Sequence, residues 1–386
     1  MTLAISAKSK RLKSQGYDVI GFGAGEPDFD TPEYIKQAAR KALDDGFTKY
    51  TPASGTDSLK QEICKKFARD NNLEYETDNI LVSCGAKHSL YNTFQALLNP
   101  GDEVIIPRPY WVSYPEMVKM GDGQPVYVDV NEENKFRMTP ENFKEKISSK
   151  TRALILNTPS NPHGAVYRKT EIEKIAEIAL DNDIIIVSDE VYEYLVYDGM
   201  EHYSTAALSP EVKEQTITIN AMSKSYAMTG WRVGYAAGNK KLIKAMSNIQ
   251  SHSTSNPNSI AQKASTAALK ETQKARQAIQ KMYEAFDDRR KFMYREINDS
   301  ELLSSVLPEG AFYTLMNISK IIGMAYKGEE ITGSLDFADV LLDAQQVAVV
   351  PGIAFGADQF VRLSYASSIE NIEQGLRRIK KFADGL

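Results

Sequence analysis

Short apolar runs alternate with amphipathic stretches through the first two thirds of the chain. The apolar runs predict buried strands, and they lie at residues 80–82, 104–106, 153–156, 184–187 and 217–219. Between them apolar residues recur at helical spacing, as at Leu59, Ile63 and Phe67. This alternation predicts an α/β fold, in which a mostly parallel sheet is covered by helices on both faces.

One helix has a complete set of signals. Thr31 and Pro32 predict its start, as N-cap and first-turn proline. Ile35 and Leu43 fall on an apolar stripe, and Gly46 is suited to end the helix. Helices therefore occupy the spaces between the expected strands.

The last third of the chain has a different pattern. Residues 255–297 are mostly helical in pattern and charged, and strands are predicted at 312–316, 347–350 and 360–364. A closing helix has Ile369, Ile372, Leu376 and Ile379 on one face. We predict a large domain over 29–285, and a smaller α+β domain formed by 1–28 and 286–386.

Composition narrows the class of protein. The 386 residues are 42% hydrophobic and 25% charged, and the net charge is −5, which gives no basic surface for nucleic acid. No apolar run approaches the roughly 18 residues of a membrane span. The cysteines, Cys64 and Cys84, are too few for a disulfide framework, so we expect a cytoplasmic protein. The four histidines are scattered, and we expect no metal site.

The most informative segment is residues 220–234. Lys224 follows an apolar run and has small and apolar neighbours, a setting that lowers the pKa of a lysine and favours Schiff-base chemistry. Ser223 and Arg232 flank it and could offer a hydroxyl and a guanidinium to a phosphate.

This segment resembles the cofactor-lysine motif of class I aminotransferases of fold type I. Residues 109–116 and 228–232 most resemble the bacterial aspartate aminotransferase subgroup. The resemblance extends from about residue 17 to the C-terminal helix. It implies a pyridoxal 5'-phosphate cofactor bound to Lys224 as a Schiff base, and transfer of an amino group from an L-amino acid to 2-oxoglutarate.

The resemblance also assigns roles around the cofactor ring. Asp189 ends an apolar strand and would pair with the protonated pyridine nitrogen, which keeps the ring cationic. Tyr192 and Asn161 would reach the phenolic oxygen of the ring. Asn161 belongs to the turn Asn157–Gly164, where His163 stands in place of the more usual threonine. Trp111 would stack on the ring.

Two further segments would bind the phosphate group. Gly85, Ala86 and Lys87 stand between a strand and a helix, where backbone N–H groups form an anion site. Tyr50 matches a tyrosine that reaches the phosphate of a partner subunit, which implies a homodimer with shared active sites.

For the substrate, Arg362 resembles the arginine that grips the α-carboxylate, with Gly25, Trp111 and Asn161 beside it. We expect aspartate as the amino donor. No motif reveals a residue for its second carboxylate, and an N-terminal segment that serves the bacterial subgroup is expected to be short or missing. Aromatic and kynurenine-type donors therefore remain alternatives.

Other functions share parts of this pattern. A β-lyase or a cyclopropane-carboxylate synthase would use the same lysine and aspartate. A transcription regulator with an aminotransferase-like domain would need an added DNA-binding segment, and Met1 leads directly into the expected domain. A dehydrogenase would need a dinucleotide fingerprint, and in residues 21–26 the sixth position is Glu26 in place of glycine.

Overall fold

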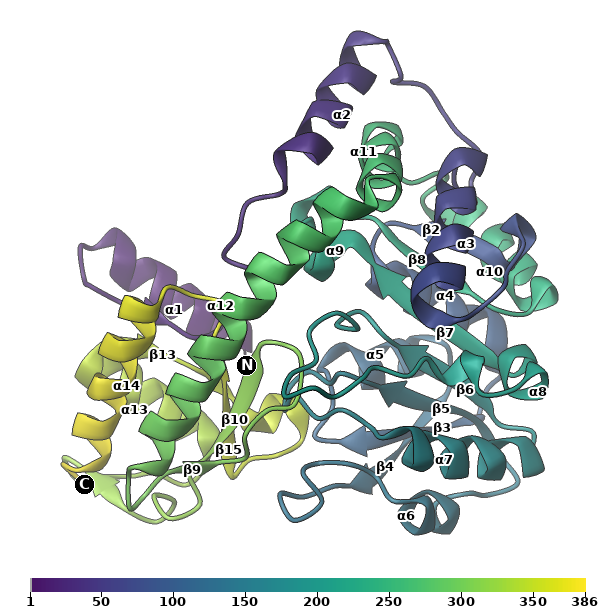
Figure 1. The fold of residues 1–386 in the computed structure, drawn as a ribbon. Helices are drawn as coiled ribbons and strands as arrows, with labels where there is room; N and C mark the ends of the chain where they lie inside the picture. Colours follow the sequence, from purple (N-terminus) through teal and green to yellow (C-terminus); the bar gives the residue numbers. More distant parts are fainter. Residues whose placement is uncertain (1) are drawn as a thin grey trace.

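The computed structural model describes residues 2–386, with side chains described from residue 7 onward, and places two sheets side by side (Figure 1). The larger sheet has the strand order β2-β8-β7-β6-β5-β3-β4. Only β8 runs antiparallel to its neighbours among these described strands. The predicted mostly parallel sheet is confirmed. Its strands are β2 (Ile80–Ser83), β3 (Glu103–Arg108), β4 (Gln124–Asp129), β5 (Thr151–Asn157), β6 (Ile185–Asp189), β7 (Thr216–Ala221) and β8 (Gly234–Ala237).

Helices cover both faces of this sheet, and side-chain alternation along the strands explains why. Val104 and Ile155 face one hydrophobic cluster, whereas Ile105 and Leu154 face another. The first cluster lies under α4 (Ala86–Leu97), α5 (Ser113–Met120) and α10 (Lys240–Ser253). The second lies under α6 (Pro140–Glu145), α7 (Lys169–Asp181) and α8 (Pro210–Glu214). A strand buried on both faces reads as an unbroken apolar run, as observed here.

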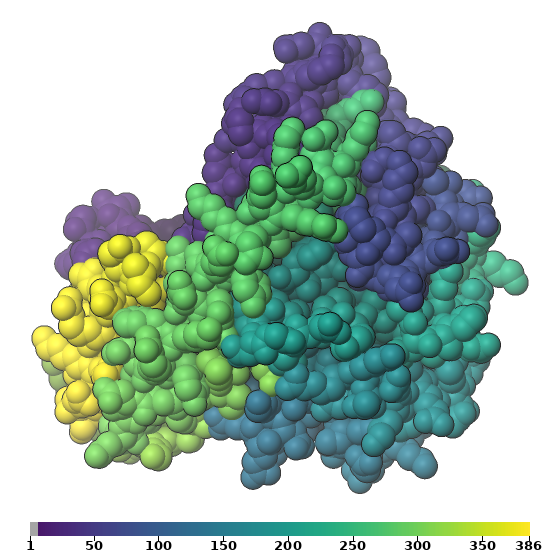
Figure 2. Space-filling view, viewed as in Figure 1, coloured from purple at the N-terminus to yellow at the C-terminus, as the bar shows by residue number. Residues whose placement is uncertain are grey.

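Helices α3 (Asp57–Asn71) and α11 (Ser259–Lys270) pack beside β2 and β8, and α2 (Glu33–Asp44) packs on α11. Two expectations for α2 were wrong. Thr31 does not cap it, because its hydroxyl donates to the carbonyl of Ala227 at 2.6 Å. Leu43 is 53% exposed rather than on the buried stripe. In the space-filling view α2 and α11 project from the body of the chain (Figure 2).

The smaller domain is built on an antiparallel sheet of order β14-β15-β10-β9. Its strands are β9 (Ser304–Ser305), β10 (Tyr313–Asn317), β14 (Val350–Pro351) and β15 (Phe360–Ser364). Two short pairs accompany it, β1 (Ile20–Gly21) with β13 (Val347–Ala348), and β11 (Ala325–Tyr326) with β12 (Glu329–Glu330). The helices are α1 (Thr2–Ser14), α13 (Ser334–Gln345) and α14 (Ile369–Ala383). The pairing of β1 with β13 joins the N-terminal segment to this domain.

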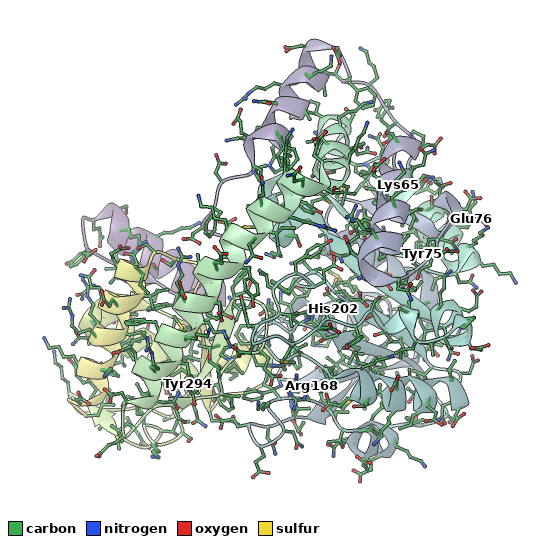
Figure 3. All side chains as sticks on the ribbon, in the orientation of Figure 1. Lys65, Tyr75, Glu76, Arg168, His202 and Tyr294 are labelled. Carbon is green, nitrogen blue, oxygen red and sulfur yellow. The ribbon has the colours of Figure 1, made fainter. Side chains whose placement is uncertain are left out.

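The long helix α12 (Thr272–Asn298) runs between the two parts, so the boundary that we place after residue 285 falls inside it. That division of the chain stays a prediction. Polar contacts also join the parts: Arg168, labelled in Figure 3, donates to Glu309 at 3.1 Å. Within residues 2–386, no helix combines the length and the apolar character needed to cross a membrane.

Candidate active site

The carboxyl ends of β5, β6 and β7 bring three chemistry-bearing loops together. The sheet register pairs Asn157 with Asp189, and Asp189 with Ile219. Above these ends lies a cavity of about 530 Å³, a size that suits a cofactor with a small substrate. The sequence-predicted residues that line it are Gly25, Ala86, Lys87, Trp111, Asn161, Asp189, Tyr192, Ser223, Lys224, Arg232 and Arg362.

Lys224 stands on the short helix α9 (Met222–Ser225), which directly follows β7. Its ammonium donates to the carbonyl of Gly25 and lies 5.9 Å from the ring centre of Tyr192. Burial lowers the pKa of Lys224 to about 8; Glu26 opposes this shift, whereas Arg362 and Arg232 add to it. An amine with that pKa is partly unprotonated near neutral pH, as a nucleophile and a base must be.

Asp189 is the last residue of β6, and its side chain is buried at the cavity wall. Oδ2 accepts a hydrogen bond from the Tyr114 hydroxyl at 2.6 Å, and Oδ1 accepts one from the N–H of Val191 at 3.4 Å. Burial raises the pKa of Asp189 to about 6, because these hydrogen bonds offset only part of the desolvation. Among the described residues, no cationic group donates a hydrogen bond to this carboxylate.

Arg362 lies in β15 of the smaller domain and reaches into the cavity. Its Nη1 donates to Oδ1 of Asn161 at 2.9 Å, and Nη2 donates to the carbonyl of Gly23 at 3.3 Å. The rings of Tyr313 and Phe355 lie 4.4 and 5.0 Å from the guanidinium carbon. Each Nη atom has a second N–H that these bonds do not use, so the guanidinium keeps donors for an anion in the cavity.

The start of α4 is packed closely against β8 and Arg232. Gly85 has a φ of 89°, and a Cβ there would stand 2.4 Å from Nη2 of Arg232. A Cβ on Gly234 would lie 2.2 Å from the amide nitrogen of Ala86. The glycines thus let the β8 backbone and the Arg232 guanidinium approach the helix start, where N–H groups lack partners within the helix. Gly85 is adjacent to the cavity without lining it.

Two aromatic relationships complete the cavity. The Trp111 ring meets Tyr114 edge-on at 5.2 Å, and the ammonium of Lys87 lies 5.0 Å from the Trp111 ring. Burial is the main cause that lowers the pKa of Lys87, and the positive charge of Arg232 lowers it further. The Tyr192 hydroxyl is 3.1 Å from that of Tyr313. Lys87 is one of four cationic side chains that line the cavity among the described residues, with Lys224, Arg232 and Arg362.

Tyr50 is the one predicted site residue that the structure places elsewhere, among the described residues. It follows α2 on the projecting part of the chain and is 92% exposed. It does not line the cavity of its own chain.

Sequence reasoning missed several cavity residues. Tyr114 stands within segment 109–116, in the first turn of α5, and the sequence reasoning gave it no role. Glu26 accepts a hydrogen bond from the Thr229 hydroxyl at 2.8 Å. Tyr313 and Phe355 gave no local signal, because they reach the site only through the packing of the smaller domain.

Comparisons with known proteins agree with this arrangement. The model of the family "Aminotransferase class I and II" matches residues 17–379. An aspartate aminotransferase of Bacillus sp. (strain YM-2) is 50% identical over 99% of this chain and 95% of its own. A probable aspartate/prephenate aminotransferase of Rickettsia bellii is 46% identical over 100% of this chain and 96% of its own. The crystal structure of the Rhizobium meliloti aspartate aminotransferase superposes with a TM-score of 0.95 at 44% identity. The match covers 100% of this chain and 96% of that one.

Proposed function

Because the chain belongs to the class I and II aminotransferase family and moves an amino group from an amino acid to a 2-oxo acid, we propose pyridoxal 5'-phosphate as its cofactor. We further propose aspartate as the amino donor and 2-oxoglutarate as the acceptor. The observation that carries this proposal is the single cavity in which Lys224, Asp189, Arg232 and Arg362 meet.

The residues present fit such a cofactor. Asp189 is a buried carboxylate that accepts no hydrogen bond from a cation among the described residues, so it is free to pair with a protonated pyridine nitrogen. The glycine-lined start of α4, with Ser223 and Arg232, offers N–H, hydroxyl and guanidinium donors to a phosphate. Lys224 lines the same cavity, where its amine can bind the cofactor covalently. Tyr192, Asn161 and Trp111 line the same cavity, and we propose that the first two donate to the phenolic oxygen and that Trp111 stacks on the ring.

The chemistry divides between cofactor and protein. When bound, pyridoxal phosphate supplies an electron sink for the electrons left on the substrate Cα. Lys224 Nζ removes the Cα proton, since its depressed pKa keeps part of it as a free amine at neutral pH. Asp189 holds the ring nitrogen protonated, and Arg362 orients the α-carboxylate so that the Cα proton faces Lys224.

The cavity also offers a candidate for the second carboxylate of aspartate. Of the cationic side chains that line it, Lys224 would hold the cofactor, Arg232 its phosphate and Arg362 the α-carboxylate. Lys87, whose ammonium lies over the face of the Trp111 ring, is the remaining cationic side chain and is available for the second carboxylate. A cation in a partly buried site favours a dianionic donor over a neutral one. The preferred donor is tested by comparing kcat/KM for aspartate with those for tyrosine, phenylalanine, alanine and kynurenine.

An aromatic donor is the second candidate, because Tyr313 and Phe355 place two rings beside the Arg362 guanidinium. A kcat/KM for aspartate more than about tenfold below that for an aromatic donor, roughly 1.4 kcal/mol in transition-state binding, would favour it. A β-lyase is distinguished by its products, since it releases ammonia in place of transferring the amino group.

We also propose a homodimer with shared sites. Tyr50 is a large, nearly fully exposed aromatic on the projecting α2 region, and it is absent from its own cavity. An exposed tyrosine there is suited to reach the phosphate site of a second copy. Cys64 and Cys84 are both unpaired, which fits a reducing compartment and our proposal of a cytoplasmic enzyme.

A further inference from the structure

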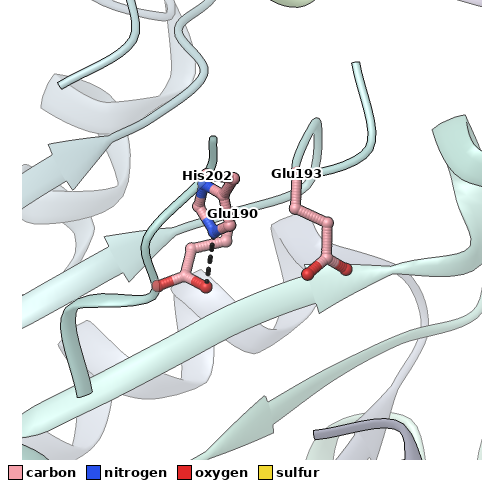
Figure 4. A group of neighbouring side chains, drawn as sticks. All are labelled: Glu190, Glu193 and His202. Carbon is pink, nitrogen blue, oxygen red and sulfur yellow. Dashed lines mark hydrogen bonds and ion pairs between the residues drawn. The ribbon is translucent and has the colours of Figure 1, made fainter. Parts of the chain in front are cut away.

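Two buried carboxylates stand on the reverse side of the turn that carries Asp189 and Tyr192. Asp189 and Tyr192 line the cavity, whereas Glu190 and Glu193 of the same turn do not. Glu190 is fully buried and Glu193 nearly so. Figure 4 shows them with His202, which bonds to Glu190. The turn thus has two residues that line the cavity and two buried carboxylates that face away from it.

Glu193 is held by three side chains. Lys66 of α3 has its ammonium 2.5 Å from Oε1 and 2.6 Å from Oε2, with only 1% of its side chain exposed. Asn71 donates to Oε2 at 2.9 Å, and Asn220 donates to Oε1 at 2.7 Å. Asn220 belongs to β7, which leads directly to Lys224. One carboxylate therefore joins α3, the Asp189 turn and the strand before Lys224.

Glu190 has an equally complete set of partners. Ser188 and Ser204 donate to Oε1 at 2.8 and 3.0 Å, and His202 Nε2 lies 3.1 Å from Oε2. Burial raises the pKa of Glu190, but the bonds from His202, Ser188 and Ser204 outweigh it and hold that pKa below its usual range. This carboxylate is thus kept as a stable, buried anion.

The cluster of Glu190, Glu193 and His202 also has the spacing of a metal site, with ligand atoms within 4.8 Å of one another. The ammonium of Lys66 already contacts both oxygens of Glu193. A divalent cation beside that ammonium would be strongly repelled in a buried setting. The structure therefore gives Glu193 a lysine, and not a metal ion, as its positive partner.

We propose that Glu193, with Lys66 as its counter-ion, is a positioning residue that fixes Asp189, Tyr192 and the Lys224 strand for cofactor binding. The inference rests on the proposed cofactor site. A fully hydrogen-bonded buried network holds its members in one geometry, and partners behind a binding group commonly decide how well that group is aimed. Without Glu193, Asn220 and the turn lose their shared anchor.

The test uses three variants of the full chain: Glu193→Gln, Lys66→Met, and the double variant that carries both changes. Ile175→Ala is the matched control, because Ile175 of α7 is fully buried, does not line the cavity and is not a hydrogen-bond partner of Glu193. This control loses stability through a core cavity alone. For each protein we would measure the melting temperature of the cofactor-free form, the dissociation constant of pyridoxal phosphate, and the pH midpoint of its visible band.

Each single variant leaves one buried charge unpaired, so its melting temperature falls. The cofactor dissociation constant should rise roughly tenfold to a hundredfold, as when outer partners of metal ligands are removed, and the band midpoint should move. The double variant has no unpaired charge, so it should regain stability while binding cofactor as weakly as the single variants.

Recovery of both stability and cofactor affinity in the double variant would overturn the proposal. So would a loss of affinity in Glu193→Gln no greater than that in Ile175→Ala at an equal fall in melting temperature. Failure of the unchanged protein to bind the cofactor would instead refute the proposed function, and this inference with it. The two failures are therefore told apart by the unchanged protein.

Discussion

Arg362 Nη1 and Asn161 Oδ1 lie 2.9 Å apart, although 201 residues separate them in the chain. The bond joins β15 of the smaller domain to the turn that follows β5. With Gly23 accepting from Nη2, it fixes the plane of the guanidinium before any substrate arrives. These two bonds use one N–H of each Nη atom, so an incoming carboxylate finds the remaining Nη donors already oriented.

Arg362→Lys should weaken substrate use while leaving cofactor binding intact. The lysine keeps the charge but loses the planar fork and the Asn161 bond. We expect kcat/KM for aspartate to fall roughly 30- to 160-fold, from a loss of about 2–3 kcal/mol. Steady-state kinetics and a cofactor titration check both parts. Unchanged kinetics would remove Arg362 from the substrate site.

Lys224→Ala should abolish turnover and covalent capture of the cofactor. Borohydride should fix pyridoxal phosphate to the unchanged protein and not to this variant, as read by intact mass. Lys65→Ala is the control, because Lys65 is an exposed lysine on α3, labelled in Figure 3, and capture should persist there. Fixation that survives in Lys224→Ala would assign the cofactor to another lysine.

Asp189 should make the stability of the cofactor-free protein depend on pH. Its pKa is about 6 when folded, against 3.8 for the ordinary group, so the folded state holds a proton that the unfolded chain releases between these values. Stability therefore falls as pH rises from about 4 to 6, by about 3 kcal/mol for this residue. The asparagine of Asp189→Asn cannot titrate. The free energy of unfolding of this variant should therefore rise relative to that of the unchanged protein as the pH rises from about 4 to 6.

Denaturant unfolding of both proteins at pH 4 to 7 measures the difference and cancels the contributions of other groups. Parallel curves would show that the pKa of Asp189 is not raised. Above pH 6, pyridoxal phosphate should stabilise the unchanged protein more than Asp189→Asn, because a protonated ring nitrogen would supply the missing cation. Turnover of the variant should fall by several orders of magnitude.

Tyr50 gives a test of the shared site. Lys224 and Arg362 lie in the same cavity of one chain, so only Tyr50 is expected to come from the partner. Inactive Lys224→Ala subunits mixed with impaired Tyr50→Ala subunits should form hybrids with one intact site. Full exchange predicts recovery of about a quarter of the normal rate, from half hybrids with one good site each. Full activity in a protein that stays monomeric during turnover would contradict the shared site.

Lys87→Met should change which donor is preferred. Removing the cation next to Trp111 should lower kcat/KM for aspartate about tenfold or more, and leave the value for alanine nearly unchanged. The cofactor should still bind, because residue 87 would contact the phosphate through its backbone N–H. An equal loss for both donors would assign Lys87 to the cofactor in place of the substrate side chain.

Much of the fold was readable in the sequence, because local patterns record burial. A strand buried on both faces is mostly apolar, and the apolar residues of β3, β5, β6 and β7 gave that signal, although β7 also buries Thr216, Thr218 and Asn220. The edge strand β4 was missed, because its exposed ends and polar residues dilute the run. The predicted N-cap at Thr31 was also wrong, because the Thr31 hydroxyl donates a hydrogen bond to the carbonyl of Ala227, which is distant in sequence.

The sequence by itself determined which residue types could do the chemistry: a lysine in small apolar surroundings, a carboxylate that ends a buried strand, and glycines at a helix start. Only the tertiary structure decided which of them meet. Lys87 and Lys224 share a cavity whereas Lys66 is sealed behind it, and Tyr114, Tyr313 and Phe355 enter from separate elements. Local sequence reports propensity and burial, whereas a site depends on contacts between segments that only the packing of the whole chain brings together.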